Sequence, residues 1–423
     1  MCEFMKKIFC IIIILILSII SCGKNSVTNP AKSIDGLIYP NNSMGQKTFK
    51  ANYRKQGNKP YDFYKVAEYD KLIVYVMAGS GYNPESVDYI AKVFNDNYDE
   101  EVRIYGEHTD VDKNGKIIIL LLELNADYSD SIGTGYFYGL DLLLNENNNA
   151  EILYMDIKMV NEKPEYMSGT IQHEFQHLIN FNVNYIRNGR QMSTWLNEAL
   201  SESTSILFFN QVKVDSRINE FNKATLGYYC FYTWNLPSES VYPNNPNSKY
   251  IFANYPSASV FMNWLYQKSG KNSSVFQNIA KYSSLVDYDR VLNNVSFTGA
   301  SSWDDLLLKW IEGVANGEVE GANIEKQEEN NNVNLYPGAI VAYDGTLSSS
   351  DNLVTRKLSS GLELALNKDI YTGYTPTSVS ITIPKASSIQ ASKMYKTVSK
   401  DDKPYIPKYR HILFDKDGKI KEY

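Results

Sequence analysis

The stretch GTIQHEFQHLIN, residues 169–180, decides how this chain is interpreted, because it places two histidines four residues apart around a glutamate. In a helix, positions i and i+4 lie on one face, one turn apart. Phe175, Leu178 and Ile179 add an apolar flank that would half-bury such a helix. The stretch therefore predicts a helix over residues 167–181 that presents His173 and His177 side by side.

This pair of histidines indicates a metal centre. Two imidazoles one helical turn apart can reach one tetrahedral zinc ion at about 2.0–2.1 Å. Glu174 is displaced from His173 by about 100° around the helix, so it can approach a water on the metal as a general base without ligating the ion. The chain has only 4 His in all, which makes the spacing informative. The alternative is a half-buried helix with two solvated histidines.

Two histidines do not complete a catalytic zinc site, which usually has three protein ligands. A second helix, expected over residues 193–209, carries the sequence WLNEALSE at 195–202. This arrangement after H-E-x-x-H resembles the gluzincin metallopeptidases. The resemblance implies that Glu198 is the third zinc ligand and that Glu202, one helical turn further on, orients His173.

The two motifs together resemble the hyicolysin family of secreted bacterial neutral metallopeptidases, over roughly residues 70–315. The resemblance implies a zincin-like catalytic domain and a zinc-dependent endopeptidase that acts on polypeptide substrates. It also implies that the strand before the metal helix, here residues 152–157, pairs with an extended substrate as an added strand. The competing interpretation is a central strand with both edges already paired.

Gluzincins stabilise the oxyanion of the reaction with a His or Tyr from the helical region after the metal site. The only histidine after Glu198 is His411, far along the chain. We therefore favour Tyr255, at the expected entry of a helix over 257–268, with Tyr250 next in line. Tyr266 lies in the body of that helix and is expected to pack in the core. All three tyrosines could equally serve packing alone.

The remaining pattern predicts an α+β protein. Apolar runs indicate strands at residues 71–77, 101–105, 116–122 and 151–157, and helical spacing appears at 85–97 and 303–314. Alternation at 378–384 indicates a β-rich end. We expect a mixed sheet with metal-binding helices, a helical domain and a small β-rich C-terminal domain, divided as follows: signal peptide 1–21, tether 22–50, catalytic domain 51–210, helical domain 211–320, linker 321–335 and β-rich domain 336–423.

A second metal site is suggested by DVDKNG, residues 110–115, which resembles the start of a calcium-binding loop. A complete EF-hand loop ends with a glutamate at its twelfth position, and that position here is Leu121. The missing ligand favours a plain hairpin turn at Asn114-Gly115 between two strands, and it leaves calcium without support.

The N-terminus resembles a bacterial lipoprotein signal. Lys6 and Lys7 precede an apolar run, residues 8–20, that is shorter than the roughly 20 residues of a membrane span. The run ends in Ile-Ile-Ser-Cys-Gly at 19–23, which predicts lipid attachment at Cys22 and a place in the bacterial cell envelope, periplasmic or surface-exposed. The alternative is an uncleaved anchor helix.

Composition narrows the classes of function. The formal net charge is −6 and the pI about 5.5, so a nucleic-acid-binding surface is disfavoured. Two functions compete with endopeptidase activity. One is a catalytically inactive surface lipoprotein or adhesin on the same fold, which the intact Glu174 argues against. The other is an aminopeptidase, which would need extra acidic residues to hold a free amine.

Overall fold

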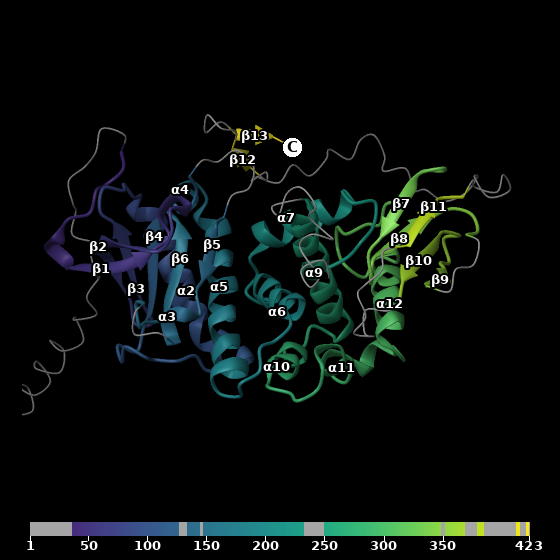
Figure 1. Cartoon of the computed structure of the whole chain (residues 1–423), viewed down its shortest axis with the longest axis horizontal. Coiled ribbons are helices and arrows are strands. Elements are labelled where there is room, and N and C mark those ends of the chain that lie inside the picture. Colours follow the sequence, from purple (N-terminus) through teal and green to yellow (C-terminus); the bar gives the residue numbers. More distant parts are fainter. Residues whose placement is uncertain are drawn as a thin grey trace, which may run out of the picture.

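The computed structural model describes residues 36–126, 133–143, 147–231, 249–347, 352–368, 379–384, 412–414 and 420–422. Figure 1 shows a sheet at one end, a group of helices in the middle and smaller sheets at the other end. The predicted signal peptide, Cys22 and the first half of the tether, up to residue 35, lie outside the described residues. No helix within the described ranges is both long and apolar enough to cross a membrane.

The large sheet has six strands in the order β1-β2-β3-β4-β6-β5. Strands β3, β4 and β6 are parallel, and the other neighbours pair antiparallel. Helices connect the parallel strands, as parallel pairing requires. The strands are β1 (Gln46–Ala51), β2 (Lys59–Glu68), β3 (Leu72–Met77), β4 (Ile117–Leu122), β5 (Gly135–Phe137) and β6 (Ile152–Asp156).

Every residue of β4 is buried, because both faces of the sheet are covered. Ile117, Ile119 and Leu121 join the larger core beneath α2 and α5, whereas Ile118 and Leu120 join a second cluster on the opposite face. This alternation follows from the two-residue period of a strand. The helices and turns of this half are η1 (Asn42–Met44), η2 (Tyr53–Lys55), α2 (Pro84–Tyr105), α3 (Leu140–Leu143), α4 (Ile157–Glu162), α5 (Pro164–Asn180) and the π-helical η3 (Phe181–Ile186).

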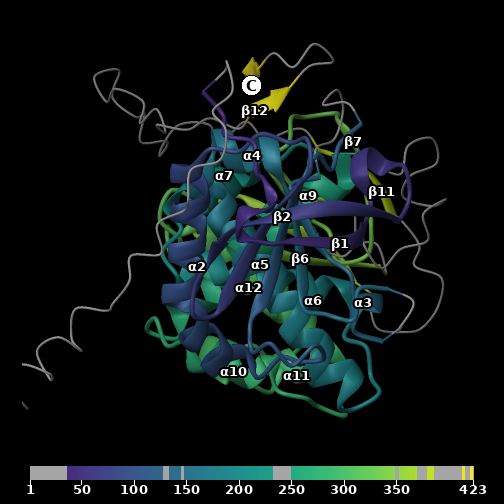
Figure 2. The same cartoon turned by 90° about the vertical axis from the view of Figure 1, so that its left-hand side faces the viewer.

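The rest of the chain is helical and then β-rich (Figures 1 and 2). Its helices are α6 (Thr194–Leu207), α7 (Gln211–Asn222), α9 (Lys249–Lys268), α10 (Ser274–Ala280), α11 (Asp287–Leu292), η5 (Ser296–Thr298) and α12 (Trp303–Ala315). Its strands are β7 (Asn332–Leu335), β8 (Ile340–Tyr343), β9 (Leu353–Lys357), β10 (Glu363–Asn367), β11 (Val379–Thr382), β12 (Ile412–Phe414) and β13 (Ile420–Glu422). They form the small sheets β8-β10-β9, β11-β7 and β12-β13.

This architecture confirms the α+β class, with a mixed sheet, two adjoining helices that carry His173, His177 and Glu198, a helical region and small β-sheets. The domain limits stay a prediction. Strand β1 begins at Gln46, within the predicted tether, and β7 begins at Asn332, within the predicted linker. One buried cluster of side chains also continues from the large sheet through the helices to β8 and β10.

Two of the predicted elements are wrong. Residues 101–105 form the last turns of α2, not a strand. The buried positions Glu101, Ile104 and Tyr105 continue the helical spacing of that helix. Because Glu101 is charged, the sequence does not reveal it as part of the buried face. Consequently the loop at 110–115 joins a helix to β4 rather than two strands, and the predicted hairpin does not form.

The predicted substrate strand is also misplaced. Strand β6 is hydrogen-bonded to β4 on one side and to β5 on the other, so neither edge is open. The edge strand next to β6 is β5, which is only three residues long. A strand this short leaves no periodic signal in a sequence.

Candidate metal centre

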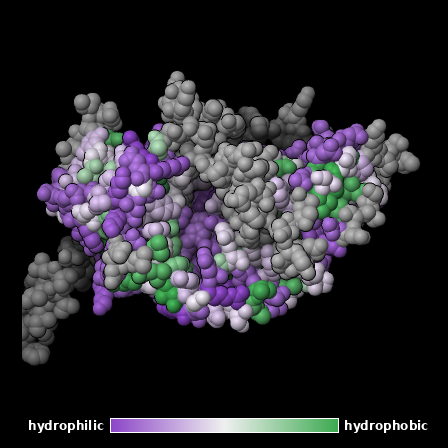
Figure 3. Space-filling model, in the orientation of Figure 1, coloured by the Kyte–Doolittle hydropathy of each residue, from purple (hydrophilic) through white to green (hydrophobic). Residues whose placement is uncertain are grey.

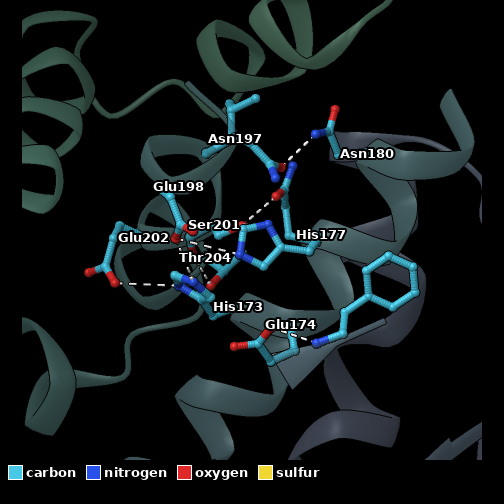
Figure 4. Close-up of polar contacts among 12 residues, drawn as sticks. His173, Glu174, His177, Asn180, Asn197, Glu198, Ser201, Glu202 and Thr204 are labelled. Atoms are coloured by element: carbon cyan, nitrogen blue, oxygen red, sulfur yellow. Dashed lines mark hydrogen bonds and ion pairs between the residues drawn. The ribbon is translucent and has the colours of Figure 1, made fainter. Parts of the chain in front are cut away.

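Helix α5 holds both histidines in a rigid frame. It begins with Pro164 in its first turn, where the missing N–H costs nothing. It is buried on most sides because it packs between α2 and α6. His173 and His177 point toward α6, which carries Glu198 (Figure 4). The structure thus brings together the three predicted ligands from the two predicted helices.

The separations between the donor atoms fit a shared metal ion. Glu198 Oε2 lies 3.2 Å from His173 Nε2 and 3.5 Å from His177 Nε2. Around a tetrahedral zinc with bonds of about 2.0–2.1 Å, two ligand atoms lie roughly 3.3 Å apart. The three donor atoms all fall within 4.8 Å of one another. The site therefore fits zinc by donor type and by spacing.

The other ring nitrogen of His177 shows how this ligand is oriented. His177 Nδ1 lies 3.0 Å from Ser201 Oγ, and Ser201 Oγ donates to Gln176 Oε1 at 2.5 Å. Because the serine hydroxyl gives its proton to Gln176, it must accept from His177 Nδ1. This assignment places a proton on Nδ1, so Nε2 is the nitrogen that would bind a metal ion, as expected for a ligating histidine.

Glu202 lies behind His173, where the resemblance placed it. Its side chain is 0% exposed, and Oε1 is 3.4 Å from His173 Nδ1, a close approach short of a well-aligned hydrogen bond. Arg217 from α7 binds both carboxylate oxygens, at 2.8 and 2.7 Å. Burial disfavours the charged carboxylate, but the Arg217 charge outweighs it and holds the pKa of Glu202 well below its usual range. Glu202 is thus a buried anion that can accept from His173.

Glu174 lies beside the three donor atoms but is not one of them. Its Oε2 accepts a hydrogen bond of 3.1 Å from the backbone N–H of Phe137, in the edge strand β5 (Figure 4). The contact fixes the carboxylate between the metal-binding helix and the sheet edge. This placement suits a proton acceptor that works next to the metal.

A chain of asparagines ties the two metal-binding helices together. Asn184 donates to Asn180, and Asn180 donates to Asn197, the residue before Glu198, each at 2.5 Å. Arg290 of α11 binds Asn184 at 3.2 Å. Asn184 belongs to η3, the π-helical turn that extends α5. Such π-turns are frequent at functional sites, and this one lies between His177 and Glu198 in the chain.

A cavity of about 420 Å³ opens onto the metal centre. In Figure 3 the surface is hollowed between the large sheet and the group of helices, and the walls of the hollow are hydrophilic. Side chains from β5, α5, α6 and α9 line it together. The lining residues are Gly135, Tyr136, Phe137, Gly139, His173, Glu174, His177, Asn180, Phe181, Asn184, Tyr185, Gln191, Met192, Asn197, Glu198 and Tyr255.

Tyr255 faces this cavity, with its ring centre 6.2 Å from that of His173. Burial, together with the Glu198 and Glu174 charges, raises the pKa of Tyr255 well above its usual value, so the phenol keeps its proton. The Arg217 guanidinium lies 4.9 Å from the centre of the ring. Tyr255 lies inside α9, which starts at Lys249, and the predicted helix entry at Pro256 is wrong.

The two other tyrosines differ in position. Tyr266 stacks on Phe276 and packs against the core, as predicted. The side chain of Tyr250 lies outside the described residues. Between Tyr255 and Tyr266, whose side chains are both described, it is Tyr255 that lines the cavity at the candidate metal centre.

At neutral pH His177 holds a proton that a bound metal ion would displace. Burial disfavours the charged form of His177, but the Glu198 carboxylate outweighs burial and raises the pKa of His177 to about 9. Burial likewise opposes ionisation of Glu198, yet both histidines lower its pKa to about 2. At neutral pH metal binding is therefore coupled to proton release.

Sequence reasoning missed Ser201, Gln176, Arg217 and the asparagine chain. Ser201 and Gln176 lie one helical turn from Glu198 and His173 respectively, so helical spacing could have suggested them. Arg217 comes from a third helix, α7. Nothing in the sequence links its position to Glu202.

A comparison with known protein sequences supports a resemblance to metallopeptidases. No family model matches the chain. It is 28% identical over 190 residues to the neutral metalloprotease ShpI of Staphylococcus hyicus, a region that covers 41% of this chain and 40% of that protein. The chain thus matches less than half the length of this relative, and its resemblance to neutral metalloproteases is confirmed over that region. An aminopeptidase N family protein from Idiomarina loihiensis shares a TM-score of only 0.34 at 9% identity, over 78% of this chain and 63% of that protein.

Proposed function

We propose that this protein is a zinc-dependent endopeptidase. The observation that carries the proposal is the set of three donor atoms from His173, His177 and Glu198 at zinc-like separations, with Glu174 fixed beside them in an open cavity. The metalloprotease resemblance over 190 residues supports it independently.

The proposed roles follow from the positions of the side chains. Zinc, when bound, acts as a Lewis acid that lowers the pKa of a water toward 7. Glu174 takes the proton of the attacking water and later delivers it to the leaving amine. Glu202, held by Arg217, orients His173, and Ser201 orients His177. Tyr255 donates a hydrogen bond to the carbonyl oxygen on which negative charge develops.

Substrate is proposed to bind along β5. This strand is an edge of the sheet and lines the cavity, so an extended peptide can pair with its outer side. Main-chain pairing gives affinity with little demand on sequence, which suits an enzyme that cleaves within polypeptides.

Tyr255→Phe is expected to reduce kcat by on the order of 10²–10³, the usual cost of removing one oxyanion donor. The ring keeps its contacts with His173 and Arg217, so zinc content and the melting temperature should match the unaltered protein. Steady-state kinetics on a peptide substrate measure the effect. An unchanged kcat would exclude Tyr255 and shift attention to Tyr250.

Two substrates test the function itself. The purified full chain should cleave casein in a reaction that a chelator stops and zinc restores. An endopeptidase should also cleave a peptide whose N-terminus is acetylated, because it needs no free amine. Cleavage of the free peptide alone would indicate an aminopeptidase. The competing function, an inactive adhesin, predicts no cleavage of either substrate.

We also propose, from the sequence at residues 19–23, that the protein is anchored to the cell envelope by a lipid on Cys22. Cys22→Ser should block lipid attachment and leave the chain unprocessed or released from the membrane fraction. Mass spectrometry of the mature N-terminus measures this. An unmodified chain that begins at another residue would overturn the anchor.

A further inference from the structure

A second group of carboxylates lies in the same half of the molecule as the metal centre but apart from it. Asp110 and Asp112, in the loop between α2 and β4, meet Glu151, the residue before β6. One carboxylate oxygen from each lies within 4.8 Å of the other two. We propose that these three residues bind a calcium ion that ties the loop to the sheet.

Glu151 provides the evidence that a cation belongs there. Its side chain is 1% exposed. One carboxylate oxygen accepts from the N–H of Val111 at 2.9 Å, while the other is buried without a hydrogen-bond partner among the described residues. A buried anionic oxygen with no partner is costly unless a cation or donor satisfies it. Asp110 and Asp112 supply the oxygens that would share this cation.

The charges of the group also require a counterion. None of the three carboxylates forms an ion pair with a Lys or Arg in the part of the chain that the structure describes. Lys47 influences Asp112 only through its longer-range charge. Three neighbouring carboxylates without a paired cation repel one another, and a divalent ion removes that repulsion.

The donor set and spacing select calcium. All three donors are carboxylate oxygens, which suit calcium rather than zinc. Calcium–oxygen bonds of about 2.3–2.6 Å place oxygens on opposite sides of one ion about 5 Å apart. The observed limit of 4.8 Å is compatible with that span. Water and main-chain oxygens would complete the six to eight ligands that calcium takes.

The loop itself is shaped to present the two aspartates. Gly115, at a φ of +68°, donates its N–H to Asp110 Oδ1 at 3.0 Å. Asn114 donates its backbone N–H to Asp112 Oδ1 at 3.2 Å and its side-chain amide to Oδ2 at 2.7 Å. Glu151, just before a different strand, thus takes the place of the ligand that the sequence lacks at Leu121.

The experiment titrates calcium into metal-stripped protein reloaded with one equivalent of zinc, by calorimetry and by thermal unfolding. One calcium should bind per chain with a Kd of about 10⁻⁴–10⁻³ M, the range of extracellular modules. At about 100 times that Kd, calcium should raise Tm by roughly 3 °C. Glu151→Gln and Asp112→Asn should each weaken binding at least about 10-fold, because each removes a charged ligand.

Two variants serve as controls. Asp99→Asn changes a carboxylate whose side chain is 80% exposed outside the group, and it should keep full calcium affinity. His173→Ala should lose zinc but still bind calcium. Glu151→Gln should be at least as stable as the unaltered protein without calcium, since it removes the unpartnered buried charge.

Three results would overturn the proposal. The first is that the unaltered protein binds no calcium below about 10 mM, and the second is that Glu151→Gln and Asp112→Asn both keep the calcium affinity of the unaltered protein. The third such result is loss of calcium binding in His173→Ala. None of them bears on the peptidase activity proposed above, which rests on different residues. If Glu151→Gln does not fold, Asp112→Asn decides alone, because Asp112 is only partly buried.

Discussion

Glu174→Gln is expected to keep one zinc per chain and to lose about 10²–10⁴-fold in kcat, the usual contribution of a general base. Glutamine has the size of glutamate, and its carbonyl oxygen can still accept from the Phe137 N–H. It cannot take a proton from water at neutral pH. The loss should therefore fall on kcat, with little change in KM.

The matched control is Glu165→Gln, which makes the same change about two and a half turns earlier on α5, outside the cavity. Its kcat and zinc content should equal those of the unaltered protein. Activity of Glu174→Gln within a few-fold of the unaltered protein would show that another residue activates the water.

His177→Ala is expected to lower zinc affinity by more than about 100-fold. Loss of a residue that only supports a ligand costs 10–100-fold, and loss of a ligand should cost more because two donors rarely retain zinc. Metal analysis after dialysis against stoichiometric zinc should find occupancy near zero, and peptidase activity should disappear with it.

His108→Gln is the control for this change. His108 is a histidine that contacts Tyr98 and Phe175, away from the metal centre. Its zinc content should stay at one per chain. Full zinc occupancy in His177→Ala would remove His177 from the ligand set.

Much of the metal centre could be predicted because its information is local. The spacing of His173 and His177 specifies one helix face, and the structure has that helix at Pro164–Asn180. The position of Glu198 came from resemblance to known metallopeptidases, and α6 places it within reach of both histidines. Helix geometry alone then brings Glu202 to the same side.

The parts that could not be predicted depend on contacts between distant segments. Arg217 of α7 contacts Glu202 of the neighbouring helix α6. Strand β5 is too short to show an alternation of apolar and polar residues. Tyr255 was expected at a helix entry because proline usually begins a helix. Helix α9 instead continues through Pro256, so the tyrosine reaches the cavity from the helix interior.

The loop at residues 110–115 shows the same limit. In an EF-hand loop that starts at Asp110, the twelfth position would supply a ligand. That position is Leu121, which is buried in β4. The carboxylate that meets Asp110 and Asp112 comes from Glu151, thirty-nine residues after Asp112, because the parallel pairing of β4 and β6 brings the start of β6 to this loop.

X-ray diffraction from crystals of the zinc-loaded protein, recorded on both sides of the zinc absorption edge, tests the central claim most directly. The account predicts one anomalous peak about 2.0–2.2 Å from His173 Nε2, His177 Nε2 and a Glu198 oxygen, with Glu174 outside bonding distance. A peak at other residues, or a zinc ion held without Glu198, would contradict it.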